Sequence, residues 1–187
     1  MAAGVRRAAG QGASSDGSSP SESRLRKNRQ LSKRSNLVVG ENSLTFTLTA
    51  SHDIGVSPLT ADEFFDQAEK AWSLTVDGKT ITINIEIIGV ENALSRFKAD
   101  LNLQLCRPSV CTTGLGAAEV AGRRIYFDAR QLFDTPTHEF GHILGFMDNV
   151  AGGTGSIMGP GRFNPPAIRS VTPNDFNSIY NLYSTGR

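Results

Sequence analysis

The sequence contains no long apolar segment. No run approaches the roughly 20 residues that cross a bilayer as a helix, so we expect no membrane span. Arg6 and Arg7 are not followed by an apolar stretch of about 7–15 residues, so the first residues do not read as a secretory signal peptide. We therefore expect a protein that leaves its cell by another route, or a chain that was trimmed from a longer one.

Cysteine is also scarce, because the chain has only Cys106 and Cys111, close together in CRPSVC. They are either two buried thiols or a disulfide that closes a small loop. We favour the disulfide because Pro108 and Ser109 suit a turn between them. A disulfide would indicate an oxidising compartment.

Acidic residues are rare in the first 36 residues. This segment contains eight Lys or Arg against two acidic residues, a net of +6, which leaves −5 for the remainder of a chain whose total is +1. It is nearly free of large apolar side chains and cannot offset its ordering entropy by burial. We predict a disordered basic linker or arm at 1–36 and one domain at 37–187. Nucleic-acid binding by the arm is the alternative, and we favour the linker because no aromatic residues interleave with the charges.

Period-two alternation predicts strands at 44–49, 80–88, 99–105 and 124–128, with a turn at 76–79. The period changes at 58–72, where Phe64, Phe65 and Trp72 fall on one helical face. For this helix we predict a capping box of Thr60 with Glu63 and a hydrophobic staple of Leu59 with Phe64. The order of elements predicts a mixed α/β (α+β) fold, with one sheet packed against helices.

The stretch HEFGHILGFMD, residues 138–148, has the chemistry of a metal site. His138 and His142, four apart, project from one face of a helix, and both imidazoles can reach one ion at about 2.0–2.1 Å. Glu139 can then face the water on that ion. The alternative is a surface helix with two solvated histidines.

A catalytic zinc takes three protein ligands and one open position, so a third ligand is needed. Gly145 is placed to end the helix in the left-handed conformation, after which the chain turns back. Asp148 follows three residues later and is our predicted third ligand. The chain has only one other histidine, His52, which we expect in a surface loop and consider the weaker alternative.

These residues resemble the metzincin zinc signature, with Asp148 in place of its last histidine, a form found in the snapalysin group of small bacterial metalloproteases. Met158, in SIMG, resembles the methionine of the metzincin Met-turn. The segment 171–183 resembles the closing helix of matrixins. It has helix signals of its own in Thr172, Pro173 and Asp175. The likeness covers roughly 44–184 and is specific from about 114 onward.

The resemblance implies a zincin fold, in which a mixed twisted sheet packs on the active-site helix and a C-terminal helix follows the Met-turn. It implies one catalytic zinc, with Glu139 as general base. A structural calcium ion is not readable from the sequence. The flat segment at 116–120 would be an edge strand that binds an extended peptide. Its residues are Gly116, Ala117, Ala118, Glu119 and Val120.

The leading functional hypothesis is a monomeric zinc endopeptidase, secreted or delivered from its cell, and in a narrower version a bacterial toxin or effector domain. A zinc amidase acting on the cell wall or on other non-protein amides is one alternative. A catalytically silent binding module is another, disfavoured because His138, Glu139, His142 and Asp148 are all present.

Overall fold

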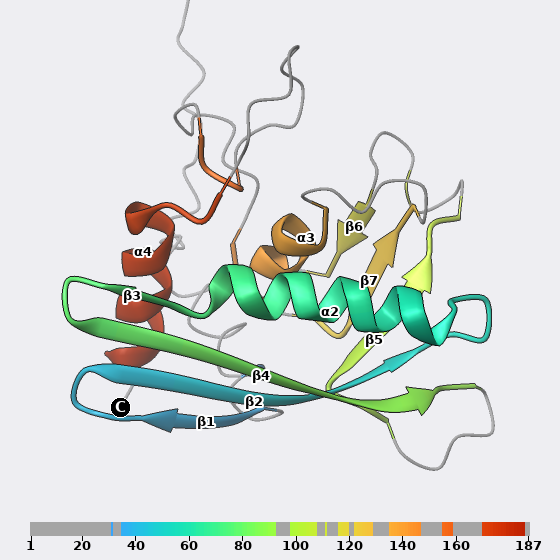
Figure 1. The fold of residues 1–187 in the computed structure, drawn as a ribbon, viewed down its shortest axis with the longest axis horizontal. Helices are drawn as coiled ribbons and strands as arrows, with labels where there is room; N and C mark the ends of the chain where they lie inside the picture. Colours follow the sequence, from blue (N-terminus) through green and yellow to red (C-terminus); the bar gives the residue numbers. More distant parts are fainter. Residues whose placement is uncertain are drawn as a thin grey trace, which may run out of the picture.

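The computed structural model describes residues 31, 35–92, 98–107, 111, 116–119, 122–128, 135–146, 155–158 and 170–185. Within these ranges the chain forms seven strands and three helices (Figure 1). The strands are β1 (Asn36–Val39), β2 (Ser43–His52), β3 (Leu74–Val76), β4 (Lys79–Val90), β5 (Leu101–Leu105), β6 (Gly116–Ala118) and β7 (Arg124–Phe127). The helices are α2 (Pro58–Trp72), α3 (Thr135–Ile143) and α4 (Pro173–Ser184).

All seven strands belong to one mixed sheet. Six of them follow the order β3-β4-β2-β5-β7-β6, and β1 lies off this series, paired with β2. The strands β4, β2, β5 and β7 run parallel to their neighbours in this series, whereas β3 and β6 pair antiparallel at its two ends. β1 pairs antiparallel with the first half of β2, and β5 pairs with the far end of β2. The predicted mixed α/β fold with a single sheet is therefore confirmed.

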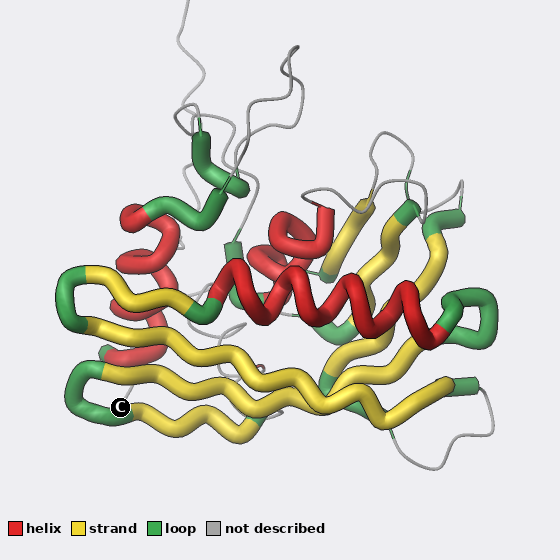
Figure 2. The backbone as a smooth tube through the Cα atoms, in the orientation of Figure 1, coloured by secondary structure: helices red, strands yellow, loops and turns green. Residues whose placement is uncertain are grey.

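The helices pack against the sheet and bury its apolar face. α2 contacts β4 and α3, α3 contacts β6 and β7, and α4 contacts β2 and β3 (Figures 1 and 2). The side chains between these layers are fully buried and include Phe46, Phe64, Trp72, Phe127 and Phe140. Because α3 lies beside β6 and β7, the predicted metal helix sits at the β6 end of the sheet.

The predicted bounds of the helix, 58–72, match α2, but the predicted capping box of Thr60 with Glu63 lies one turn too late. The N-cap is Ser57, whose hydroxyl accepts a hydrogen bond from the Thr60 backbone N–H at 3.1 Å. Pro58 then occupies the first turn, where its fixed φ and missing N–H cost nothing. Leu59 is 76% exposed, so it cannot form the predicted staple. The buried face itself is as predicted, with Phe64, Phe65, Ala68 and Trp72 in the core.

The predicted turn at 76–79, the apolar side of 80–88 and the start of the last helix agree with the structure. β3 and β4 form a hairpin whose central residues, Asp77 and Gly78, both have positive φ. That is the requirement of the type I′ turn that suits twisted hairpins. Ile81 and Ile83 of β4 are buried. α4 carries the predicted capping box between Thr172 and Asp175.

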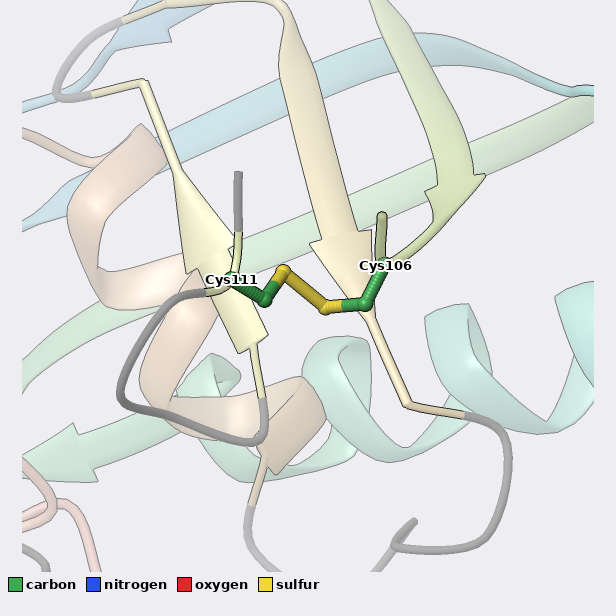
Figure 3. Close-up of a disulfide and its surroundings, with 2 residues drawn as sticks. All are labelled: Cys106 and Cys111. Carbon is green, nitrogen blue, oxygen red and sulfur yellow. A yellow bond between two sulfur atoms is a disulfide. The ribbon is translucent and has the colours of Figure 1, made fainter. Parts of the chain in front are cut away.

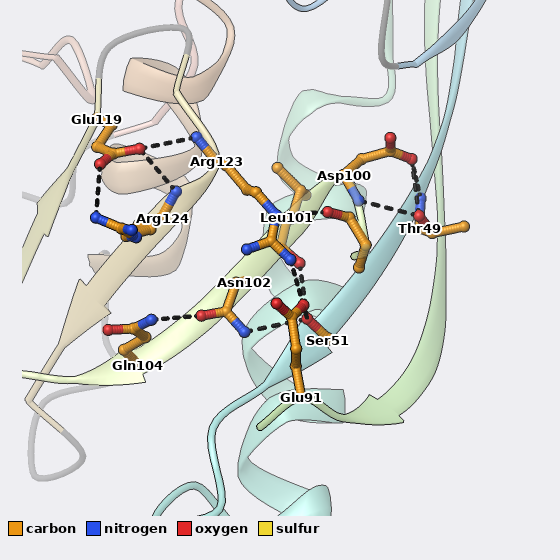
Figure 4. Close-up of polar contacts among 11 residues, drawn as sticks. Thr49, Ser51, Glu91, Asp100, Leu101, Asn102, Gln104, Glu119, Arg123 and Arg124 are labelled. Carbon is orange, nitrogen blue, oxygen red and sulfur yellow. Dashed lines mark hydrogen bonds and ion pairs between the residues drawn. The ribbon is translucent and has the colours of Figure 1, made fainter. Parts of the chain in front are cut away.

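The opposite face of the sheet carries polar side chains that bond to one another (Figure 4). Asn102 alternates with buried Leu101 and Leu103, and its amide donates to the hydroxyl of Ser51 at 3.1 Å. Ser51 also donates to Glu91, which forms an ion pair with Arg123. Burial raises the pKa of Glu91, but the hydrogen bonds from Arg123 and Ser51 and the charge of Arg123 outweigh it, so the pKa is lowered overall.

A disulfide links Cys106 and Cys111, with their Cα atoms 5.6 Å apart. It lies just beyond the end of β5 (Figure 3). The Cys106 N–H donates to the Phe127 carbonyl of β7. The bridge therefore ties the chain that leads toward β6 to the last strands of the sheet.

The predicted basic arm lies mostly outside the described residues, and its disorder stays a prediction. Leu31 is nevertheless fully buried in the core and Ser35 is 6% exposed. β1 begins at Asn36, so packed residues begin upstream of the predicted boundary at 37. None of the described helices is long and apolar enough to cross a membrane.

Candidate metal centre

Helix α3 brings His138 and His142 together on one face. Their ring centroids are 4.8 Å apart, and the ring planes are inclined at 87°. His142 is 8% exposed and His138 is half-buried. The alternative of two solvated surface histidines is therefore wrong, since the helix is packed into the domain.

Each ring is oriented by a hydrogen bond from its Nδ1 atom to a backbone carbonyl. His138 Nδ1 lies 2.8 Å from the Ile157 carbonyl oxygen, and His142 Nδ1 lies 2.9 Å from that of Phe146. A carbonyl oxygen only accepts, so the hydrogen of each neutral ring is on Nδ1 and the lone pair is on Nε2. This is the arrangement by which metal-binding histidines are usually held.

The chain turns sharply after the metal helix, as predicted at Gly145. This residue has φ of 108°, in the range that favours glycine. The Phe146 N–H donates to Gly141 and the Gly145 N–H donates to His142, at 3.0 and 2.9 Å. These two bonds form a Schellman motif. The turn thus places the Phe146 carbonyl within hydrogen-bond distance of the His142 ring.

Met158 lies directly against α3. A Cβ atom added to Gly141 would clash with the Met158 sulfur and would lie 3.0 Å from the Trp72 ring. Only glycine at this position lets the Met158 and Trp72 side chains approach the helix so closely. Gly141 lies between the two histidines in the sequence. Met158 is 1% exposed and belongs to a turn at residues 155–158, which we call the Met158 turn.

Glu139 is 4% exposed and lies against β6. A Cβ atom added to Gly116 would lie 2.5 Å from Glu139 Oε1 and 2.9 Å from its Cγ and Cδ atoms. Gly116 pairs with Phe127 of β7, and β6 is the last strand in the sheet order. The carboxyl group of Glu139 therefore lies beside the backbone of a terminal strand of the described sheet.

The segment predicted as an edge strand forms β6 at Gly116–Ala118, with all three residues half-buried. Its binding of a substrate stays a prediction. Glu119 follows β6 and folds back on its own hairpin, where its carboxylate accepts from the Arg123 N–H at 3.1 Å and lies 3.6 Å from Arg124. Val120 lies outside the described residues.

The third predicted ligand, Asp148, also lies outside the described residues. Within the described ranges, no three His, Cys, Asp or Glu side chains are grouped to hold a metal ion. His52 is described and does not join the pair on α3, so the alternative ligand is disfavoured. It also does not lie in a surface loop, because it is the last residue of β2 and only 2% exposed.

The two histidines fit a zinc ion as far as the described residues define the site. Both rings carry the Nδ1–H tautomer that presents Nε2 to a metal, and zinc prefers nitrogen, sulfur and carboxylate ligands. Glu139 belongs to the same helix.

Several contacts that fix the site were not predicted from sequence. The Trp72 indole N–H donates to the Thr137 carbonyl at 2.9 Å, and the Tyr183 hydroxyl donates to the Leu144 carbonyl at 2.9 Å. Trp72 was predicted only to lie on the apolar face of its helix, a pattern that gives no information on its indole N–H. Ser156 was not singled out, although a serine two residues before a turn position is a known signal for a side-chain-closed turn.

Comparison with known proteins adds little to this geometry. No family model and no curated protein matches the sequence. One similar solved structure is archaemetzincin from Archaeoglobus fulgidus in complex with malonate. It is 12% identical, the match covers 70% of this chain and 98% of that one, and the TM-score is 0.46. A likeness this distant carries no information on activity, metal or substrate.

Proposed function

We propose that this protein is a zinc-dependent endopeptidase. The observation that carries the proposal is one short helix on which two histidines, each held by an Nδ1–H bond to a carbonyl, flank a buried glutamate beside a terminal strand. A solvated or purely structural pair of histidines would not need both rings fixed in the tautomer that presents Nε2.

In this proposal His138 and His142 bind zinc through Nε2, and Asp148 completes the ligand set. A bound zinc polarises the scissile carbonyl and lowers the pKa of its water. The carbonyls of Ile157 and Phe146 keep the two rings from rotating, which lowers the entropic cost of binding the ion.

Glu139 is the proposed general base. It would take the proton of the attacking water and pass it to the leaving amine. Its burial supports this role, because a carboxylate in a site of low polarity interacts strongly with a nearby positive charge. The contact with Gly116 sets where the carboxyl group can lie.

The substrate is proposed to be a protein or peptide that binds in an extended form along the segment predicted at 116–120, of which Gly116–Ala118 forms β6. Main-chain hydrogen bonds would hold it, and the small side chains of Ala117 and Ala118 would let its backbone approach. The carboxyl group of Glu139 would then lie close to the peptide bond to be cleaved.

A secreted or delivered protein is the narrower proposal. The Cys106–Cys111 disulfide supports it, because disulfides persist in oxidising compartments and are rare in reducing ones. A toxin or effector role would follow from such delivery. Because Leu31 and Ser35 are buried and β1 begins at Asn36, we propose that only the residues before Leu31 act as a linker, and not as a nucleic-acid arm. We further propose that the domain acts as a monomer.

The test is metal analysis together with peptide hydrolysis for the full chain and for Glu139→Gln. We expect one zinc per chain in both proteins and turnover only in the first, with a loss of at least about 100-fold. Asp148→Ala should lose zinc, whereas the matched control His52→Ala should retain it. A full chain without stoichiometric zinc would refute the proposal.

A comparison of substrates shows which kind of amide bond the protein cleaves. Casein and quenched-fluorescence peptides should be cleaved, and peptidoglycan should not. The opposite result would assign the site to a cell-wall amidase instead.

A further inference from the structure

A buried acidic residue of α4 is connected to one of the proposed ligands on α3 through the Met158 turn. Asp175 is 5% exposed and lies at the start of α4. Its Oδ2 atom accepts from the Thr172 N–H and hydroxyl, at 2.9 and 2.7 Å. These bonds complete the capping box, which alone would account for an acidic residue at this position.

Asp175 makes a second set of contacts that the helix cap does not require. The Ser156 hydroxyl donates toward both carboxylate oxygens, which lie 3.0 and 3.1 Å away. The same hydroxyl oxygen accepts from the Met158 N–H at 3.1 Å. The Ser156 hydroxyl therefore links the α4 cap to the backbone of the Met158 turn by hydrogen bonds.

The Met158 turn in turn determines where the Ile157 carbonyl lies. The Ile157 N–H donates to the Ser170 carbonyl at 2.9 Å, and Ser170 N–H donates back to Gly155 at 3.2 Å. The Ile157 carbonyl is then directed at Nδ1 of His138, 2.8 Å away. Ile157 itself is fully buried, so its peptide unit has little room to rotate.

We propose that Ser156 and Asp175 form a positioning pair that fixes the His138 ring in its Nδ1–H tautomer. The contacts run from the Asp175 carboxylate through the Ser156 hydroxyl and the Met158 and Ile157 backbone to the imidazole. His142 has no part in this chain of contacts, because its carbonyl partner, Phe146, follows the same helix. The consequence for zinc affinity rests on the proposed function, whereas the tautomer does not.

Three variants separate this role from simple stabilisation. Ser156→Ala removes the hydroxyl that bridges the turn and Asp175. Ser156→Thr keeps a hydroxyl and should preserve the bridge between the turn and Asp175. Thr172→Ala is the matched control, because it removes a hydroxyl from the same carboxylate and weakens the α4 cap, by about 1 kcal/mol, but leaves the Ser156 contacts in place.

The first measurement uses zinc-free protein labelled with ¹⁵N in its histidine rings. The chain has three histidines, so the imidazole signals are few. At about pH 8, where imidazole is neutral, two- and three-bond ¹H–¹⁵N correlations identify the tautomer of each ring. We expect Nδ1–H for His138 and His142 in the parent chain, and a mixture of tautomers for His138 alone in Ser156→Ala. Asp175→Asn should act in the same direction, which gives a second variant if Ser156→Ala does not fold.

The second measurement is the zinc dissociation constant, by competition with a chelating dye. It should rise by about 10- to 100-fold in Ser156→Ala, the usual effect of losing a partner that orients a ligand, and stay within about twofold in Thr172→Ala and Ser156→Thr.

The proposal is overturned if the His138 tautomer is unchanged in both Ser156→Ala and Asp175→Asn, or if Thr172→Ala disturbs it equally. If the parent chain binds no zinc, the proposed function fails, but the tautomers still decide whether Ser156 and Asp175 position the ring.

Discussion

The contact between Gly116 and Glu139 allows the proposed base to be displaced without touching the ligands. In Gly116→Ala the new Cβ would lie 2.5 Å from Glu139 Oε1, whereas ordinary contacts begin at 3.4 Å. The carboxyl group must therefore retreat by about 0.9 Å. Gly116 is not among the described glycines with positive φ, so alanine strains no backbone. The new Cβ would also lie 2.9 Å from Cγ and Cδ of Glu139, so the side chain must turn from Cγ outward, and the urea midpoint separates any loss of stability from the loss of kcat.

The effect on catalysis should be large in comparison. A displacement of about 1 Å in a catalytic group costs roughly 100-fold in rate. We expect kcat to fall by about that factor while zinc stoichiometry and the urea midpoint stay near those of the parent chain. A base displaced by the methyl group lowers kcat, whereas a substrate backbone kept away by it raises KM.

The assay is cleavage of a quenched-fluorescence peptide, with kcat and KM determined separately and zinc measured on the same samples. Gly55→Ala is the matched control, since it adds the same methyl group at a position where the new Cβ would meet only Leu105, at an ordinary 3.5 Å. If zinc-loaded Gly116→Ala keeps kcat within about threefold of the parent, the position of Glu139 beside β6 has no part in the reaction.

Three further predictions concern stability and are measured by urea denaturation. Tyr183→Phe should lower the free energy of unfolding by about 1 kcal/mol, because it removes the hydrogen bond to the Leu144 carbonyl while the edge contact with Phe46 remains; an unchanged value would mean that water replaces the hydroxyl. Glu91→Gln should cost about 1–2 kcal/mol at pH 7. Because the folded-state pKa of Glu91 is lowered, the ionised group stabilises the fold above its ordinary value of 4.5, and this contribution is lost as the pH falls through the lowered pKa. The difference between parent and variant should therefore shrink below pH 4.5, and a difference that does not change with pH would contradict the ion-pair account. Reduction of the disulfide should lower the free energy of unfolding by on the order of 2 kcal/mol, because it frees a loop in the unfolded chain, and an unchanged value would contradict this chain-entropy account.

The parts of the fold that sequence patterns predicted are those set by neighbours in the chain. The α4 capping box, the hairpin at Asp77 and Gly78, and the end of α3 at Gly145 all depend on residues within a few positions of one another. The start of α2 depends on such a pattern too, but two patterns competed there. The N-cap could be Ser57, followed by Pro58, or Thr60, followed by Glu63. The structure has Ser57 as the cap, because proline fits the first turn of a helix and cannot occupy a later one.

The candidate site divides in the same way. The spacing of the two histidines and Glu139 indicated a metal helix, and α3 carries them as expected. The contacts between Gly116 and Glu139 and between Ser156 and Asp175 join residues about 20 positions apart, and the sequence contains no periodic signal for them. Trp72 was predicted as core because its apolar ring fits a helical face, a pattern that says nothing about its indole N–H.

The shortness of α3 explains why these longer-range contacts are needed. Its nine residues are fewer than the about 12–15 at which an isolated helix becomes marginally stable in water. Its first turn is tied to α2 through Trp72, its last turn to α4 through Tyr183, and its middle packs on Met158. The spacing of the two imidazoles is therefore a property of three surrounding elements and not of the helix alone. If the site binds zinc as proposed, substitutions that loosen those elements should weaken that binding even where they touch neither histidine. The largest effect is expected where the element also supplies a carbonyl to a ring, as the Met158 turn does for His138.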